Sequence, residues 1–222
     1  KIRNGKMYIL LDEIQNIEKW EKAINSLNID FDVDIYITGS NAYLLSSELA
    51  TLLSGRYIEI KMYTLSFKEF LKFNGYNQEH IEDKFNEYLK YGGLPAITQI
   101  KEKNNLIMSY LTDIYNTIVK KDIIERNNIK DIALLENIVK YISSNIGSSV
   151  SANKISDYLN SNKIVEKTNH QTIDNYLKML ENAFIVYKAE RSDIRSKALL
   201  KTLGKYYIAD TGLRNIILGF RN

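Results

Sequence analysis

The spacing of apolar and polar residues changes along the chain and predicts alternating strands and helices. Residues 8–11 form a continuous apolar run, which is typical of a strand buried on both faces. Residues 17–27 then place apolar side chains at helical spacing, and residues 33–38 predict a second strand. A strand, a helix and a strand in this order predict two parallel strands joined by a crossover helix.

The middle of the chain is predicted to be mostly helical. Helices are expected over residues 42–53, 66–74, 80–91 and 106–126, with a third strand over residues 57–62. Ser66 and Glu69 have the spacing of a capping box, which would begin the second of these helices. Gly75 and the Gly92-Gly93 pair are expected to end the helices that precede them.

The last part of the chain predicts three helices followed by a pair of strands. The helices are expected over residues 134–145, 151–160 and 172–182, with Ser151 capping the second and Asn169 or His170 preceding the third. An alternating strand over residues 184–190, a polar loop over 191–197 and a return strand over 198–201 would follow. This order of elements is typical of a winged helix.

Polar residues stand where the first two predicted strands end. Asp12 and Glu13 follow the first strand, and Gly39-Ser40-Asn41 follows the second. Open α/β sheets bind ligands at the carboxyl ends of their strands, and the acid pair resembles the Walker B arrangement that P-loop ATPases place around Mg²⁺ and the attacking water. The alternatives are ordinary acids at a loop start and an ordinary Gly-Ser-Asn turn.

Composition removes several classes of function without selecting one. Thirty basic and 27 acidic residues leave a net charge of +3, so the overall charge neither favours nor opposes nucleic acid. The absence of cysteine excludes disulfides and thiolate metal sites, and the two histidines, His80 and His170, give no support to a histidine metal site or a catalytic triad. No apolar run reaches the roughly 18 residues of a membrane helix, so we expect a cytoplasmic protein with no membrane partner.

Six sequence blocks, taken in order, resemble a family of bacterial and archaeal AAA-type ATPases that carry a winged helix and a restriction-endonuclease-like segment behind the ATPase core. The blocks are LLDEIQ at 10–15, TGSNA at 38–42, LSGR at 53–56, LSFKEF at 65–70, YGGLP at 91–95 and KYYIADTGL at 205–213. The resemblance covers essentially the whole chain.

The resemblance implies an α/β fold: a partial parallel-sheet P-loop ATPase core with a helical lid, followed by a mostly α winged-helix domain. We expect the partial core at residues 1–75, the lid or connector at 76–130, the winged helix at 131–201 and the start of the endonuclease-like segment at 202–222. The first buried strand follows residue 1 almost directly, so we expect the chain to be a fragment of a longer parent protein.

The resemblance also implies roles for particular residues. Asp12 and Glu13 would be the Walker B pair, with Asp12 holding Mg²⁺ through water, and Ser40 and Asn41 would be sensor-like. Arg56 would meet the γ-phosphate of ATP, from its own subunit or from a neighbouring one. The alternative for Arg56 is a surface ion pair.

The chain departs from the family in two places. Thr64 replaces the proline that usually precedes Leu65, which is a minor change. More importantly, the sequence Gly-x-x-x-x-Gly-Lys-Ser/Thr occurs nowhere, so the loop that cradles the nucleotide phosphates is missing. We therefore expect ATP and Mg²⁺ to be cofactors of the parent protein and this fragment itself to be inactive.

The third helix of the predicted winged helix would present Gln171, Asn175 and Lys178 outward, where they could reach DNA bases. The predicted wing carries Arg191, Arg195 and Lys197, which would attract phosphates, whereas Asp174 and Glu181 on the helix would repel them. Winged helices also pack against proteins, so a protein partner or a second copy of the chain remains an alternative to DNA.

Two functions follow from these observations. In the first, the chain is the C-terminal portion of an AAA-type ATP-hydrolysing protein whose nucleotide state controls the winged helix. In the second, the chain is a DNA-binding winged-helix protein in which the ATPase part is a scaffold. Nuclease activity is not expected, because the clustered acids that metal-dependent cleavage needs do not appear before Asn222.

Overall fold

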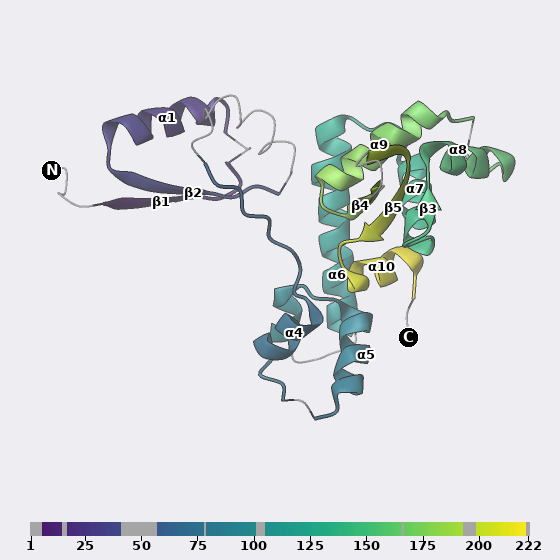
Figure 1. The fold of residues 1–222 in the computed structure, drawn as a ribbon, viewed down its shortest axis with the longest axis horizontal. Helices are drawn as coiled ribbons and strands as arrows, with labels where there is room; N and C mark the ends of the chain where they lie inside the picture. The colour runs from purple at the N-terminus through teal and green to yellow at the C-terminus, as the bar shows by residue number, and fades with distance from the viewer. Residues whose placement is uncertain are drawn as a thin grey trace. The chain divides into compact units, whose positions relative to one another are not determined.

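The computed structural model describes residues 6–14, 17–40, 57–77, 79–100, 105–165, 167–192 and 199–220. The chain divides into two compact units, Lys1–Lys61 and Met62–Asn222. Figure 1 shows the small sheet of the first unit and the largely helical second unit. The helix predicted over residues 42–53 lies outside the described residues.

The first unit contains a two-stranded parallel sheet. Strands β1 (Met7–Leu11) and β2 (Val33–Ile37) pair in parallel with Leu11 opposite Ile37, and helix α1 (Trp20–Asp30) connects them. Trp20 and Ile24 of the helix pack with Ile14 against one face of the sheet. The strand–helix–strand prediction is therefore confirmed.

Helix α1 begins three residues later than predicted. Lys19, the residue before the helix, has a left-handed backbone with φ of 58°, and Ile17 is 56% exposed. Ile17 has helical spacing with Trp20 and Ile24, but it does not join their contact with the sheet. The apolar pattern at helical spacing therefore begins before the helix itself does.

The third strand predicted over residues 57–62 is wrong. These residues form neither helix nor strand, and Ile58, Ile60 and Met62 are at least three-quarters exposed. Their alternating pattern favours an extended backbone, but a strand also needs a partner with which to form a ladder. No described strand pairs with this segment.

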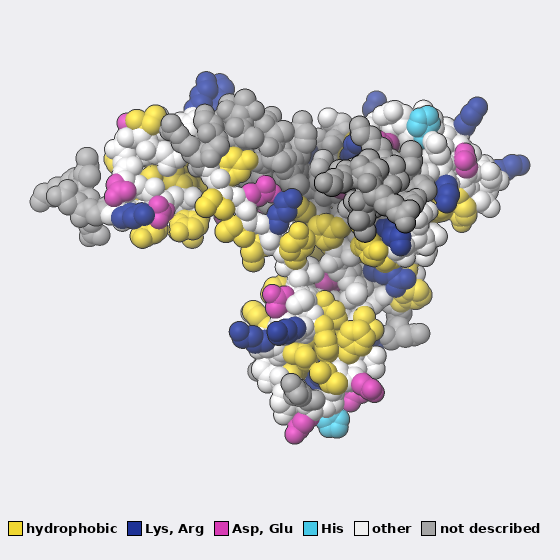
Figure 2. Space-filling view, in the orientation of Figure 1, with side chains coloured by type: hydrophobic (Ala, Val, Ile, Leu, Met, Phe, Trp, Pro, Cys, Tyr) yellow, Lys and Arg dark blue, Asp and Glu magenta, His cyan; other side chains and the backbone are white. Residues whose placement is uncertain are grey.

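The second unit begins with two short helices, α4 (Phe67–Phe73) and α5 (Ile81–Tyr91). The predicted capping box is confirmed: the Ser66 side chain accepts from the Glu69 N–H, and the Glu69 carboxylate accepts from the Ser66 N–H at 2.8 Å. Phe67 packs edge-on against Phe85, which holds the two helices together. Figure 2 shows hydrophobic side chains gathered on this part of the surface.

The long helix predicted over residues 106–126 is present but not uniform. After the short 3₁₀ helix η2 (Pro95–Gln99), helix α6 (Asn105–Thr117) continues directly into a π-helical segment, η3 (Ile118–Glu125). Apolar spacing predicts a helix but does not distinguish α from π geometry, in which the hydrogen bonds span one more residue. Within η3, Ile123 is fully buried in the same cluster as the next helix.

The remaining elements form a compact helical body with a three-stranded antiparallel sheet. In order they are α7 (Ile132–Ser144), β3 (Ser149–Val150), α8 (Ala152–Ser161), α9 (His170–Asn182), β4 (Val186–Ser192), β5 (Leu199–Ile208) and α10 (Thr211–Leu218). The sheet has the order β3-β5-β4. The predicted helices and the caps of α8 by Ser151 and α9 by Asn169 are confirmed.

One core cluster joins these elements. Ile138 and Ile142 of α7 pack with Ile173, Leu177 and Leu180 of α9, and all five side chains are essentially inaccessible to water. The return strand β5 is longer than predicted, because it continues past residue 201 to pair with β4 as far as Val186 opposite Ile208. Among the described residues, no helix combines the length and apolar character that crossing a membrane requires.

Candidate functional site

The acid pair lies at the edge of the sheet where β1 and β2 both end. Because Leu11 pairs with Ile37, the next residues of the two strands, Asp12 and Thr38, are neighbours. The Thr38 N–H donates to the Leu11 carbonyl at 2.9 Å, and the Ile14 N–H donates to the Thr38 carbonyl at 3.3 Å. The sheet ladder therefore continues for a short distance past the strand ends and fixes the loop that carries the two acids.

Thr38 contacts both members of the acid pair. Its hydroxyl Oγ1 donates a hydrogen bond to Asp12 Oδ1, and the same oxygen accepts from the Glu13 N–H at 3.2 Å. A threonine hydroxyl has one proton and two lone pairs, so it can serve both groups at once. The hydroxyl thereby orients the Asp12 carboxylate relative to the backbone of Glu13.

Glu13 has a backbone conformation that is rare for residues other than glycine. Its φ of 50° lies in the left-handed region, which costs about 1–2 kcal/mol for a side chain with a Cβ. Backbone strain of this kind is concentrated at functional sites, where the surrounding structure holds it in place. The side chains of Asp12 and Glu13 are both exposed, so ligands can reach them.

The sequence predicted Ser40 and Asn41 at this edge and missed Thr38. Ser40 is half-buried just beyond β2, whereas Asn41 and Arg56 lie outside the described residues. Thr38 could have been found from the strand register. If the two strands end together, the hydroxyl residue that directly follows the second strand lies opposite Asp12, the first acid. The structure brings together Asp12, Glu13 and Thr38, with Ser40 two residues further along the chain.

The carboxylates of Asp12 and Glu13 fit the Mg²⁺ ion of a Mg²⁺-nucleotide. Mg²⁺ prefers oxygen ligands and usually keeps several waters, so one or two carboxylates are sufficient protein ligands. Among the described residues, no group of three or more His, Asp or Glu side chains forms a complete metal site. The phosphate side has no counterpart here, because the 222 residues contain no glycine-rich P-loop sequence.

A second group of predicted residues lies on helix α9. Gln171, Asn175 and Lys178 are all exposed, as predicted, and their spacing places them on one face of the helix. Lys178 Nζ forms an ion pair with Asp174 Oδ2 at 2.9 Å, which offsets its charge. Arg191 belongs to β4, whereas Arg195 and Lys197 lie outside the described residues.

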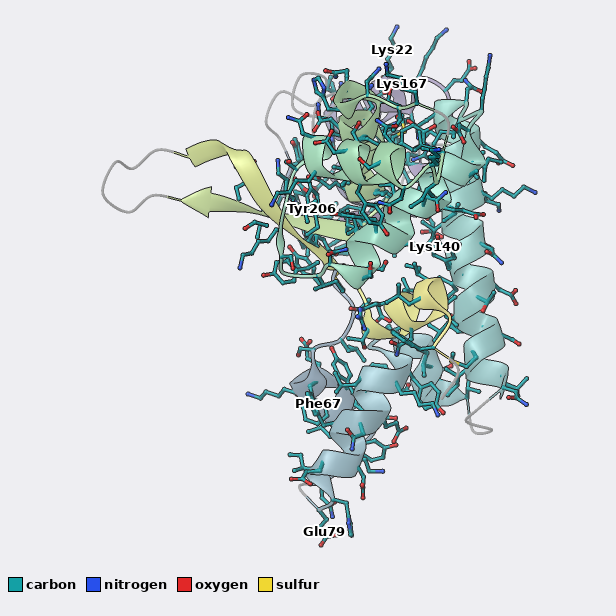
Figure 3. The ribbon with its side chains drawn as sticks, turned by 90° about the vertical axis from the view of Figure 1, so that its right-hand side faces the viewer. Lys22, Phe67, Glu79, Lys140, Lys167 and Tyr206 are labelled. Carbon is teal, nitrogen blue, oxygen red and sulfur yellow. The ribbon has the colours of Figure 1, made fainter. Side chains whose placement is uncertain are left out.

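The turn between α8 and α9 is held by Asn160, a residue that no sequence motif singled out. Asn160 Nδ2 donates to the Thr168 carbonyl at 2.8 Å, and Asn160 Oδ1 accepts from the Thr168 N–H at 2.9 Å. The turn carries two exposed lysines, Lys163 and Lys167. Lys167, which is labelled in Figure 3, lies just before α9 in the sequence.

A third polar cluster surrounds Asp210, which is only 4% exposed. Its Oδ2 accepts from the Gly93 N–H at 2.7 Å, and its Oδ1 accepts from the Leu213 N–H at 3.1 Å, capping α10. Burial raises the pKa of the Asp210 carboxyl, and backbone N–H donors, that of Gly212 included, partly offset the effect. Three of the six family-like blocks, around Leu65, Gly93 and Asp210, meet here.

Comparison with known proteins gives the class of the first unit and the family of the chain. Residues 1–71 match the family described as AAA domain, which supports a relationship to the AAA-type ATPases. The chain belongs to the family described as Domain of unknown function (DUF8612), which residues 82–222 match.

Two curated relatives are similar over nearly all of the chain. An uncharacterized protein of Haemophilus influenzae is 48% identical, and the match covers 96% of this chain and 53% of the relative. Uncharacterized protein MJ1544 of Methanocaldococcus jannaschii is 33% identical, over 99% of this chain and 50% of the relative. The chain thus spans about half the length of the curated relatives it matches.

A solved structure supports the fold. The Walker-type ATPase PABY2304 of Pyrococcus abyssi superposes with a TM-score of 0.60, covering 96% of this chain and 63% of that chain. The sequence identity is 14%, so the likeness concerns the fold alone. The likeness therefore supports the α/β architecture of the chain.

Proposed function

We propose that this chain is the C-terminal portion of an AAA-type ATPase in which Asp12 and Glu13 form the Walker B pair. The observation that carries the proposal is the contact of the acid pair with Thr38 at the shared end of two parallel strands. Parallel sheets bind nucleotides at this edge. The AAA-domain match over residues 1–71 supports the same function.

The residues of this edge have distinct roles in the proposal. The Asp12 carboxylate, oriented by the Thr38 hydroxyl, would hold Mg²⁺ through water, and Glu13 would orient the attacking water. Ser40, Asn41 and Arg56 remain the proposed sensor and γ-phosphate contacts. When bound, ATP would supply the phosphoryl group that is transferred, and Mg²⁺ would neutralise the charge on the phosphates. In this proposal the phosphate cradle belongs to a part of the parent protein outside these 222 residues.

We further propose that α7, β3, α8, α9, β4 and β5 form a winged helix that responds to the nucleotide. Three helices, with a short strand between the first two and a β-hairpin after the third, are the order that defines this motif. The single buried cluster shared by α7 and α9 supports one rigid module. The proposed winged helix thereby supplies the part that nucleotide binding would control.

The test of the ATPase proposal uses the longer Haemophilus influenzae relative, which is 48% identical to this chain. With this chain in place of the matched segment of that relative, Glu13→Gln should lower ATP turnover by about 10²–10⁴-fold, because the group that positions the attacking water or accepts its proton is removed. In the same chimera, Glu18→Gln, at an exposed residue before α1, is the matched control and should leave turnover unchanged. Undiminished turnover in the first variant would refute the Walker B assignment. The present chain alone should show no hydrolysis.

DNA is the second candidate, and the polar face of α9 together with the two lysines of the preceding turn favours it. Gln171 and Asn175 present amides that could read adenine edges, and Lys163 and Lys167 would contact phosphates beside them. In this function the first unit would serve as a scaffold.

A duplex titration at low salt tests the DNA proposal. Replacing Lys163 and Lys167 by Ala should weaken binding to all sequences and lower the slope of log affinity against log salt by roughly 0.9 for each phosphate that the protein no longer neutralises. Neutralising Arg191, Arg195 and Lys197 tests the proposed wing in the same way. Lys140→Ala, which removes an exposed charge from α7, is the control. If the unmodified chain does not bind at low salt, a protein partner or a second copy replaces DNA as the proposal.

A further inference from the structure

Asp210 joins three segments that are far apart in the sequence. Residues 64–65, 92–93 and 210–213, which we call the Asp210 junction, are linked by hydrogen bonds from Gly93 and Leu213 to the Asp210 carboxylate. Gly93 in turn accepts from the Leu65 N–H at 2.8 Å, and the Thr64 hydroxyl donates to the Ala209 carbonyl at 3.0 Å. Each segment is thus bonded directly to another part of the junction.

The junction has no room for local adjustment. A Cβ at position 93 would fall on the Leu65 carbonyl oxygen, and one at position 212 would fall on the Tyr91 carbonyl oxygen. Both neighbours are backbone atoms, which cannot move aside by changing rotamer. The Tyr88 hydroxyl also donates to the Leu65 carbonyl at 2.8 Å, so residue 65 is held from two sides.

On one side the junction receives the covalent connection from the first unit. The first unit ends at Lys61, and residues 62–65 are the first residues of the second unit. Because Thr64 and Leu65 are bonded to Ala209, Gly93 and Tyr88, a pull on residues 62–65 acts on all three. A displacement of Thr64 would therefore act on Ala209, the residue that precedes Asp210.

On the other side the junction reaches α7 through helix α10. Leu213 of α10 packs in the cluster of Tyr91 and Leu111, and Ile217 packs in the cluster of α7 and α9. Arg214 Nε donates to the carbonyl of Ser143, the buried next-to-last residue of α7, at 3.0 Å. Figure 3 shows α10 between α5 and the body above it, in agreement with its contacts to α5, α6 and α7.

We propose that the Asp210 junction is the coupling element through which a displacement of residues 62–65 reaches helix α10 and, through α10, helix α7. Asp210 is a positioning residue: only a carboxylate offers one oxygen to Gly93 and the other to the first turn of α10. The inference rests on the proposed function, because it names the route by which the nucleotide state would act on the proposed winged helix. The route requires no contact between the acid pair and α9.

Amide hydrogen exchange of the whole chain tests the route without nucleotide. Asp210→Asn keeps an acceptor for Leu213 but turns an N–H₂ group toward the Gly93 N–H, so exchange at Gly93 and Leu65 should accelerate about tenfold or more. Asp210→Ser keeps the helix cap and removes the bridge without opposing two donors, and it should give the same pattern if Asp210→Asn folds poorly. Asp131→Asn, a change at the cap of α7, is the matched control and should leave both amides unchanged.

The coupling itself is measured with Thr64→Val, which removes the hydroxyl bond to Ala209 and little else. If the route exists, this change accelerates exchange in α10 and at the end of α7, and the acceleration disappears when Asp210→Asn is already present. Acceleration confined to residues 64–65, or effects that simply add, would overturn the proposal. A failed ATPase assay would leave this exchange result intact, so the two proposals can fail separately.

Discussion

Gly93→Ala perturbs the Asp210 junction by one methyl group. The added Cβ would fall on the Leu65 carbonyl oxygen and lie 3.1 Å from both the carbonyl carbon and the nitrogen of the same residue. Leu65 would have to move away, and its movement would break two hydrogen bonds: Leu65 N–H to the Gly93 carbonyl and Tyr88 hydroxyl to the Leu65 carbonyl. The substitution therefore adds a steric clash and removes two bonds.

The cost follows from these changes. Overpacking of a close-packed site costs about 1–3 kcal/mol, and each neutral hydrogen bond contributes about 1 kcal/mol. We expect the free energy of unfolding of the second unit to fall by roughly 3–5 kcal/mol, which is large for one methyl group. Gly75→Ala is the control, because nothing lies within 4 Å of a Cβ there and only the left-handed φ of +66° is penalised. That strain should cost about 1–2 kcal/mol.

The two units can be followed separately in one denaturant titration. Trp20, the chain's one tryptophan, is 5% exposed in the core of the first unit, so its fluorescence reports that unit. Circular dichroism at the helix band reports mainly the second unit, which contains every described helix except α1. Gly93→Ala should move the dichroism transition to lower denaturant and leave the fluorescence transition in place. A destabilisation no greater than that of Gly75→Ala would refute the close packing of Gly93 against Leu65.

Two further predictions concern the second unit. Because burial raises the pKa of Asp210, the unfolded chain releases this proton at lower pH, from about pH 4, than the folded chain does. The unfolding free energy of the wild type should therefore fall relative to that of Asp210→Asn as the pH rises through the folded pKa. Denaturant titrations of both proteins across pH measure this difference in unfolding free energy, and a wild-type value that stays level or rises relative to the variant contradicts the burial effect. Leu177→Ala should lower the free energy of unfolding by about 2–5 kcal/mol in the same titration at neutral pH, because Leu177 is 1% exposed where α9 packs against α7. Lys178→Ala, at the exposed neighbouring residue, is the control and should change it little.

The helices of the second unit could be predicted because their signals are local. Ile173, Leu177 and Leu180 repeat at helical spacing and form the buried face of α9, and Ser66 and Ser151 have the side chains that accept from the first free N–H groups. These interactions span three or four residues and are visible in any window of the sequence. The helices that were predicted lie within about three residues of their expected positions, whereas α10 and the short η2 were not predicted.

The features that could not be predicted depend on partners distant in the chain. Residues 57–62 have a strand-like pattern, but pairing is decided by an available edge, which the segment itself does not encode. Thr38 acquires its contact with Asp12 only when two strands end in register. The Asp210 block was visible as a motif, but its bond to Gly93 spans 117 residues and has no signature in composition or spacing.

The sheet of the first unit sets a limit on how the isolated chain can be handled. Within the described part of the chain, no strand pairs with the outer edge of β1 or of β2, and Tyr8, Leu10 and Tyr36 are more than half exposed. Unpaired edges beside apolar side chains are templates for pairing with other chains. Aggregation at high concentration would therefore start in the first unit, and the protein concentration used in any assay is limited by these two edges and not by the well-packed second unit.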